Sequence, residues 1–346
     1  MKNKKYYIIL FFLLALFIQK NVNAQKTDTI FHINGNILTG ELKKIEYGVV
    51  VFKMDGMGTI NIEEVKVNSI LSRKSFEIKL KNGVIYLASF DTTGFDRKVY
   101  LVFDTGRKSV NVEDIVEVYP IKRNFWMRSS GDFSLGVNYS KGSDVATLAF
   151  SGNLDYRKQK TYFNFFWDEN TTFQADSISA RKADITFVYQ RLLKNRYSFE
   201  ASIGASQNRE MGTKLRLAVN GLALRDLMYS SWSRFYVGAG LTVTSETPYD
   251  DSGIQEDLAG LFSVVWKVFK YTHPKMWVDA NISFIPYFTD SGRYRSVFNL
   301  NPKINLFSDN FKVGFKFYYS LDSKPPSDAA STSDYGINLQ ITYSFH

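Results

Sequence analysis

The chain ends in a strict alternation of apolar and polar residues. Over residues 335–345 every second position is apolar, and the positions between them carry glycine, amides or hydroxyls. A period of two predicts a β-strand with one apolar and one polar face. About eleven similar segments of roughly ten residues precede it from Gly131 onward, and this is the length that a tilted strand needs to cross a bilayer.

Two architectures can use such strands. In a soluble sandwich the apolar faces of two sheets meet, whereas in an outer-membrane barrel the apolar face meets lipid and the polar face lines the lumen. Twelve apolar stripes would make a very large core for one domain of about 220 residues. A closed barrel leaves no sheet edge in lipid, and the 29 Phe and 21 Tyr are typical of aromatic girdles. We therefore predict an all-β protein with a twelve-stranded antiparallel transmembrane β-barrel over residues 125–346.

The predicted connections fit a barrel whose two chain ends lie on the periplasmic side. Short turns are expected at 157–160, 193–196, 270–275 and 308–310. Longer outer loops are expected at 168–181, 244–256 and 321–334. Outer-membrane barrels have short periplasmic turns and longer extracellular loops, which agrees with this order. The inner connection at 223–232 is the exception, and its sequence also fits a brief interfacial helix.

A β-rich segment over residues 26–121 precedes the barrel and contains a short internal repeat. The sequence NGNILTGEL from Asn34 parallels NGVIYLASF from Asn82, and INIEEV parallels VNVEDI further along each copy. Asn-Gly between β-rich runs indicates a hairpin, so the segment is predicted to be a small duplicated module of the SH3/Sm-like type. Each copy carries an acidic pair, at 63–64 and at 113–114. These pairs could serve a metal or acid–base site, but a solvated turn is the simpler interpretation.

Residues 1–24 have the features of a secretory signal peptide. Lysines near the start precede an apolar run over 6–18, which is short for a membrane-spanning helix. A retained membrane anchor is the alternative interpretation. The chain has no Cys, which excludes a disulfide and a lipidated cysteine anchor. Export predicts a protein of the cell outer membrane of a Gram-negative cell, with the 26–121 module in the periplasm.

The polar face of the predicted barrel defines the candidate lumen lining. Its charged positions are Asp155, Asp184, Glu200, Arg216, Lys267, Asp279, Arg295, Lys303, Lys312 and Lys316. One interpretation is a narrow, mildly anion-favouring channel for small solutes, with the last lysines forming a cationic strip. Another is that these charges pair across the lumen and close it. A third is a closed structural or docking barrel whose periplasmic module binds peptidoglycan or a periplasmic protein, or plugs the barrel mouth.

Other function classes lack the residues that they need. The histidines are His32, His273 and His346, and none falls on a barrel strand at the outer leaflet, where a barrel lipase would hold its catalytic His. The chain contains no G-x-S-x-G and no His pair at zinc spacing. We therefore expect no enzyme and no catalytic, cofactor-binding or metal-binding residues. Loss of the signal removes four lysines and lowers the formal net charge from +9 to +5, which is too mild to indicate a nucleic-acid partner.

The barrel resembles the DUF481 family, whose members are described as salt-induced outer-membrane proteins. The resemblance covers residues 125–346 and rests on GDFSLGVNYSKGSDVATLAFSGNLDYR at the start of the barrel and on INLQITYSF at its end. The front module resembles extensions of Bacteroidetes-like members. The family implies an outer-membrane location, with lipid and the barrel-assembly machinery as partners, and no established substrate. It also implies an assembly signal in the last strand, here Tyr343 and Phe345, with His346 as an extra residue after the final aromatic.

Overall fold

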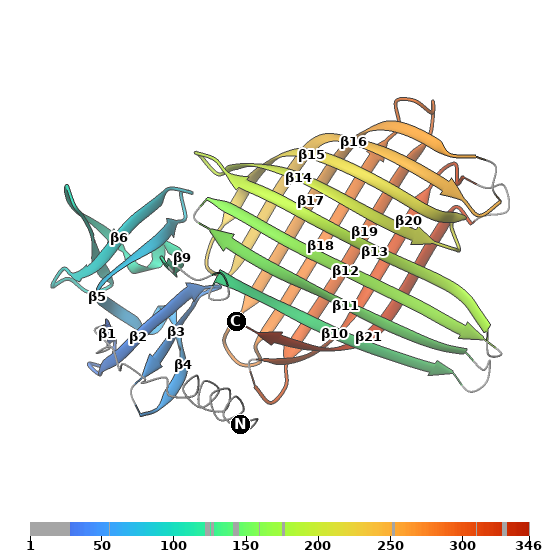
Figure 1. Ribbon diagram of the computed structural model, residues 1–346. Coiled ribbons are helices and arrows are strands. Elements are labelled where there is room, and N and C mark those ends of the chain that lie inside the picture. Colours follow the sequence, from blue (N-terminus) through green and yellow to red (C-terminus); the bar gives the residue numbers. More distant parts are fainter. Residues whose placement is uncertain are drawn as a thin grey trace, which may run out of the picture.

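The computed structural model describes residues 28–54, 56–121, 125, 128–140, 145–158, 160–174, 177–250, 253–308, 310–326 and 331–345. The predicted signal peptide, the tip of the first barrel hairpin at 141–144, most of the linker at 122–127 and His346 lie outside these residues. Among the described residues, no helix is both long and apolar enough to cross a membrane. Figure 1 shows a small β-module followed by a barrel, with the module at the barrel end that carries the C-terminus.

The second part of the chain is a closed barrel of twelve antiparallel strands, as predicted. Each strand pairs with the next in sequence, and the first strand closes on the last. The strands are β10 (Ser129–Ser140), β11 (Val145–Lys158), β12 (Thr161–Gln174), β13 (Ser177–Leu192), β14 (Tyr197–Asn208), β15 (Thr213–Tyr229), β16 (Ser233–Pro248), β17 (Gln255–Lys270), β18 (Met276–Pro286), β19 (Tyr294–Asn305), β20 (Phe311–Asp322) and β21 (Ser333–Phe345). Because every strand has a partner on both sides, the wall presents no open edge.

The two faces of the barrel wall have opposite chemistry. Leu135, Leu241 and Ile341 point outward and are 54–58% exposed, as are most apolar side chains of their parity. Their strand neighbours Ser134 and Thr342 point inward and are at most 3% exposed. A continuous exposed apolar band of this size is unfavourable in water and is covered by hydrocarbon in a membrane. The protein is therefore a transmembrane β-barrel of the outer-membrane type.

Two predicted connections of the barrel are wrong. The outer loop expected at 168–181 is strand, because β12 continues to Gln174 and β13 begins at Ser177. β12 and β13 stay paired beyond their last apolar residues, because polar residues also need partners for their backbone N–H and C=O groups. The end of the apolar alternation therefore does not mark the end of the strand. The interfacial helix suggested at 223–232 is absent, since β15 runs on to Tyr229. Leu222 and Leu224 are buried inside the barrel, and Ala223 between them points outward. Both faces of β15 are therefore apolar here, and the sequence does not alternate.

The module before the barrel is a nine-stranded sheet. Its strands are β1 (Asp28–His32), β2 (Ile37–Glu46), β3 (Val49–Met54), β4 (Gly58–Glu63), β5 (Val67–Leu80), β6 (Ile85–Thr92), β7 (Lys98–Phe103), β8 (Gly106–Asn111) and β9 (Ile115–Pro120). The first half of β5 pairs with β1, and its second half pairs with β6 and β9, so one long strand serves both copies of the repeat. The fully buried Phe52, Phe76 and Phe90 belong to one hydrophobic core that both copies share.

The acidic pairs of the repeat differ in their surroundings. Glu64 is only 5% exposed, which corrects the prediction of a solvated turn at 63–64. Its carboxylate pairs with Arg97 at 2.8 Å, and the same guanidinium donates to the carbonyl oxygens of Glu64 and Val67 at 2.6 Å. In the second copy Asp114 accepts a hydrogen bond from Asn111 at 3.0 Å. Glu64 therefore joins the two copies of the repeat through one ion pair.

The seam between β10 and β21 should be sensitive to any added side chain. The two strands pair only from Gly131 to Gly136, and a Cβ on Gly136 would lie 2.5 Å from the Leu339 carbonyl oxygen. We expect Gly136→Ala to destabilise the folded barrel by about 1–3 kcal/mol, because the backbone of the seam must shift. The measurement is the temperature at which the refolded barrel loses its compact band in detergent gels. Gly221→Ala is the control, since a Cβ there meets nothing within 4 Å; equal midpoints for both variants would contradict the prediction.

Candidate functional site

The module lies against the barrel end that carries the short turns, which we call the turn end; the opposite end is the loop end (Figure 1). The contact face belongs to β2, β5 and β9, which lie side by side in the module sheet. Ile78 and Val118 of these strands point into the module core, so the alternate positions point to the other face. Those positions carry Glu77, Lys79 and Glu117, which would be solvated if the module stood alone. Here Glu77 and Lys79 are each only 5% exposed.

Arg157 of the barrel makes the principal ionic contact with this face. It is the penultimate residue of β11 and has the parity of the lumen side. Its two terminal nitrogens donate to Glu117 at 2.5 Å and to Glu77 at 2.9 Å. Its guanidinium carbon also lies 4.2 Å from the centre of the Tyr119 ring. One arginine of the barrel rim therefore engages both β5 and β9 of the module.

Tyr47 provides an aromatic contact at the same end of the barrel. It lies at the turn between β2 and β3 with a φ of 54°, followed by Gly48 with a φ of 76°. The Tyr47 ring centre lies 4.1 Å from that of Phe269 and 5.2 Å from that of Trp277. These two barrel residues are cross-strand partners on β17 and β18. A Cβ on Gly48 would lie 3.7 Å from the Ser231 Cβ, so the whole hairpin tip is seated on the barrel rim.

Lys79 is the buried cation of the module face. Its Nζ lies 3.9 Å from the centre of the Tyr229 ring, at the end of β15. Burial lowers the pKa of Lys79 to about 8, although the negative charge of Glu117 acts in the opposite direction. For Glu117, burial alone would raise the pKa, but the charges of Arg157 and Lys79 outweigh it and hold this pKa well below its usual range. The face is therefore a balanced set of charges at neutral pH.

All ten charged positions predicted for the lumen have the parity opposite to the exposed apolar side chains, and most have partners. Asp155 accepts hydrogen bonds from Tyr162 and from Asn164, and Lys267 lies 4.0 Å from Asp279. Lys316 forms an ion pair with Asp168, and Asp184 lies beside Asp168 on the next strand. Lys312 donates to Ser344 at 3.0 Å. Glu200 pairs in register with Gln190 and Leu222, and Lys303 with Trp277 and Gly314.

Arg216 and Arg295 belong to a charge cluster at the loop end. Its centre is Arg293, 3% exposed, which pairs with Asp322 at 2.8 Å, with Glu246 at 2.9 Å and with Asp257 at 3.2 Å. Arg295 lies 3.5 Å from Glu246, and Arg216 lies 3.9 Å from it. Arg293 was not among the predicted lumen residues, and its carboxylate partners were expected in or beside loops. Acidic residues in the 244–256 segment were the only sequence signal for this cluster.

Several polar contacts join strands that are not neighbours in the barrel wall. Lys316 on β20 meets Asp168 on β12, and Asn338 on β21 donates to Asn170 on β12 at 2.5 Å. Lys182 on β13 donates to Ser320 on β20 at 3.3 Å. Because the sheet order separates these strands, their side chains meet across the lumen instead of along the wall. Side chains therefore cross the lumen here, and Lys316 is paired with Asp168, while Lys312 contacts the Ser344 hydroxyl.

Comparison with solved structures returns barrels at low sequence identity. They include a bacterial polysaccharide outer membrane secretin (8% identity, TM-score 0.34, covering 63% of this chain and 98% of the other). The NanC porin has 10% identity and a TM-score of 0.38, covering 62% of this chain and 99% of the other. A loop L8 deletion mutant of OmpT, an outer membrane protein of Vibrio cholerae, has 10% identity and a TM-score of 0.31, covering 79% and 96%. Among curated proteins, none matches the chain.

The family comparison agrees with the resemblance found in the sequence. The model of the DUF481 family, described as a protein of unknown function, matches residues 133–345, which is almost the whole barrel. Because this match spans more than half of the chain, the protein belongs to the DUF481 family.

Proposed function

We propose that this protein is an outer-membrane channel for small solutes whose own N-terminal module closes it from the periplasm. The observation that carries the proposal is the seating of the module: Glu77 and Glu117 pair with Arg157 at the rim, and Tyr47 packs on Phe269 and Trp277. The short turns of such barrels face the periplasm, which supports a periplasmic position for the module. The proposal includes no catalysis, cofactor or nucleic-acid partner.

The barrel has the dimensions and lining that a small channel needs. At twelve strands it is wider than the eight-stranded barrels that side chains fill and narrower than the large porins. Many of its inward side chains are hydroxyls, amides and charges with partners, among them Asn281, Asn299 and Ser134. A polar lumen of this kind hydrates small solutes, and paired charges give little preference for ions of one sign.

The docked face is suited to reversible closure. Inter-domain contacts within one chain resemble transient interfaces, and relative motion of the domains is the usual expectation. A buried ion pair contributes little net free energy, because its desolvation offsets its attraction, and separation returns both partners to water. Tyr47 contributes one large apolar side chain to this contact. The module can therefore hold the closed state without a large barrier to release.

A second candidate role is docking of the module to peptidoglycan or to a periplasmic protein. The observation that favours it is a set of exposed apolar side chains on the module turns, with Ile33 at 57%, Val65 at 61% and Phe95 at 68% exposure. Ile33 and Val65 lie on adjoining turns, because the Ile33 N–H donates to the Lys66 carbonyl at 3.0 Å. Single exposed apolar residues are common on protein surfaces, so this observation is weaker than the seated module.

Locking the module to the rim with a disulfide should hold the channel closed. The separation of 3.7 Å between a Cβ on Gly48 and the Ser231 Cβ is within the range of disulfides, and the chain has no other Cys. We expect the oxidised Gly48→Cys/Ser231→Cys variant to stay at the closed conductance level in a planar bilayer, and reduction to restore wild-type openings. The Gly48→Cys single variant is the control, because the positive φ at this position strains any side chain by roughly 1–2 kcal/mol. Undiminished openings in the oxidised form would refute closure by the module.

Closure should strengthen as the pH rises above 8. Lys79, which faces Glu117, Arg157, Asp226 and Arg234, has a pKa of about 8 when docked, and exposure to water returns it toward 10.5. Between these two values the undocked state binds the extra proton, so raising the pH favours the docked state. We expect the docking equilibrium to shift toward closure by about tenfold from pH 7 to pH 9. Open probability in bilayers measures this shift, and Lys79→Met should remove it; an unchanged pH response in that variant would contradict the assignment to Lys79.

A further inference from the structure

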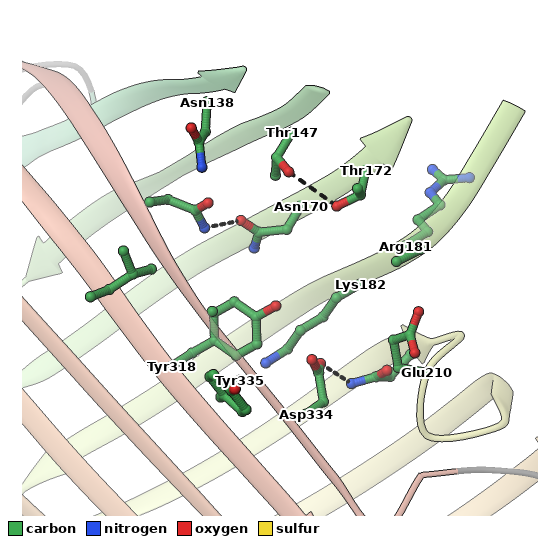
Figure 2. Close-up of a pocket in the computed structure, with 15 residues that line it drawn as sticks. Asn138, Thr147, Asn170, Thr172, Arg181, Lys182, Glu210, Tyr318, Asp334 and Tyr335 are labelled. Carbon is green, nitrogen blue, oxygen red and sulfur yellow. Dashed lines mark hydrogen bonds between the residues drawn. The ribbon is translucent and has the colours of Figure 1, made fainter. Parts of the chain in front are cut away.

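A polar cavity of about 170 Å³ lies inside the barrel at the loop end (Figure 2). Its lining comes from β10, β11, β12, β13, β14, β20 and β21 and from Glu210 in the turn after β14, and it shares no lining residue with the Arg293 cluster. A volume of about 170 Å³ accommodates several waters. This is less than the 300–1,000 Å³ that is usual for larger ligands. The cavity is therefore of a size for one small solute and not for a polymer.

Carboxamides and hydroxyls dominate the lining. Figure 2 shows Asn138, Asn170, Thr147 and Thr172 around the cavity, and Asn208 and Asn338 complete the set of amides. A carboxamide carries both donors and an acceptor, and a hydroxyl does the same on one atom. The groups that match such a lining are those that also donate and accept, and hydroxyl groups do both. An inorganic ion would instead be favoured by ligands of one sign.

Four charged residues line the cavity, Arg181, Lys182, Glu210 and Asp334. Arg181 forms an ion pair with Glu169 at 2.9 Å. Lys182 donates to Ser320 at 3.3 Å, and its Nζ lies 3.9 Å from the centre of the Tyr318 ring. Asp334 accepts a hydrogen bond from Asn208 at 2.8 Å. Two of the four charges are positive and two are negative, so their fields partly cancel in the cavity. The cavity therefore offers neither a net positive nor a net negative site.

Hydrogen bonds between lining side chains hold the polar groups in place before any solute arrives. Asn338 donates to Asn170 at 2.5 Å, and the hydroxyls of Thr147 and Thr172 lie 3.2 Å apart. The Tyr318 ring lies against Gly336, where a Cβ would be 2.6 Å from the ring. Any side chain at Gly336 would thus push this ring from its place at the cavity wall. Groups held in position lose little freedom when a solute binds, which favours affinity.

We propose that this cavity is a binding site for a neutral polyhydroxylated solute, a single sugar or polyol. The inference rests on the proposed channel for its biological meaning, because the site would select what enters the lumen from outside. Binding itself needs no flux, so the site can be tested apart from conductance. It also does not depend on release of the module at the opposite end.

Titration calorimetry of the refolded full chain, without the predicted signal peptide and in a detergent that has no sugar headgroup, tests the site. We expect glucose to bind saturably with a Kd of about 1–10 mM. Glucosamine and gluconate, the cationic and anionic counterparts, should bind more weakly. Asn138→Ala and Asn338→Ala should each weaken glucose binding by about five- to tenfold, the effect of one lost neutral hydrogen bond. Gly336→Ala should abolish binding without removing a polar group.

Asn281→Ala is the matched control, since it removes an inward amide outside the cavity and should leave glucose binding unchanged. The compact gel band of each variant reports that its barrel is folded. Absence of saturable glucose binding, equal loss in Asn281→Ala, or tighter binding of either charged sugar would overturn the proposal. Glucose binding to a chain that is silent in bilayers would retain the site and refute the channel. Conductance without glucose binding would support the channel and refute the sugar site.

Discussion

The pairing of backbone groups in hydrocarbon is the constraint on which the rest of this structure depends. Every N–H and C=O of the membrane-spanning strands must find a partner within the protein, so the sheet closes and β10 meets β21. Closure then divides the side chains into two environments, because strand neighbours point to opposite faces. Apolar residues such as Leu135 face lipid, and polar residues such as Ser134 are enclosed. The enclosed charges cannot reach bulk water freely, so they pair, as Lys316 does with Asp168.

The module strands also alternate between apolar and polar residues, but here the apolar face is enclosed and the polar face points outward. Its core is a normal hydrophobic interior around Phe52, Phe76 and Phe90, and its second face is charged, as a surface exposed to water would be. That charged face is covered by the barrel rim instead of by water. Glu77 and Glu117 consequently require a cation within reach, which Arg157 supplies. A charged face that would be exposed to water on an isolated domain therefore forms ion pairs that connect the module to the barrel.

The features of the fold that depend on local sequence pattern could be predicted from the sequence. The contacts between residues far apart in the sequence could not. Strand parity fixes which side of the wall each residue occupies, and the number of apolar stripes, the aromatic content and the loop lengths then favoured a closed twelve-stranded barrel over a sandwich. The pattern failed at β15, where Leu222 and Leu224 make both parities apolar. Arg157 was visible only as part of a basic turn, because its partners lie 40 and 80 residues away in another domain. Arg293 was missed for the same reason, since its carboxylates come from three separate segments.

The two ends of the lumen are restricted by different kinds of contact. At the loop end the contacts lie within the barrel, and at the turn end they join the barrel to the module. At the loop end Arg293 and its three carboxylates all belong to the barrel itself, so separating them would leave buried charges without partners, at a cost of several kcal/mol. At the turn end the contacts join two bodies, and separation exposes both charged faces to water together. If the barrel is the proposed channel, opening at the turn end costs less free energy than opening at the loop end. In the proposed channel, the docked module would act as the gate at the turn end and the polar cavity at the loop end would select the solute, so that selection and release are carried out by separate parts of the barrel.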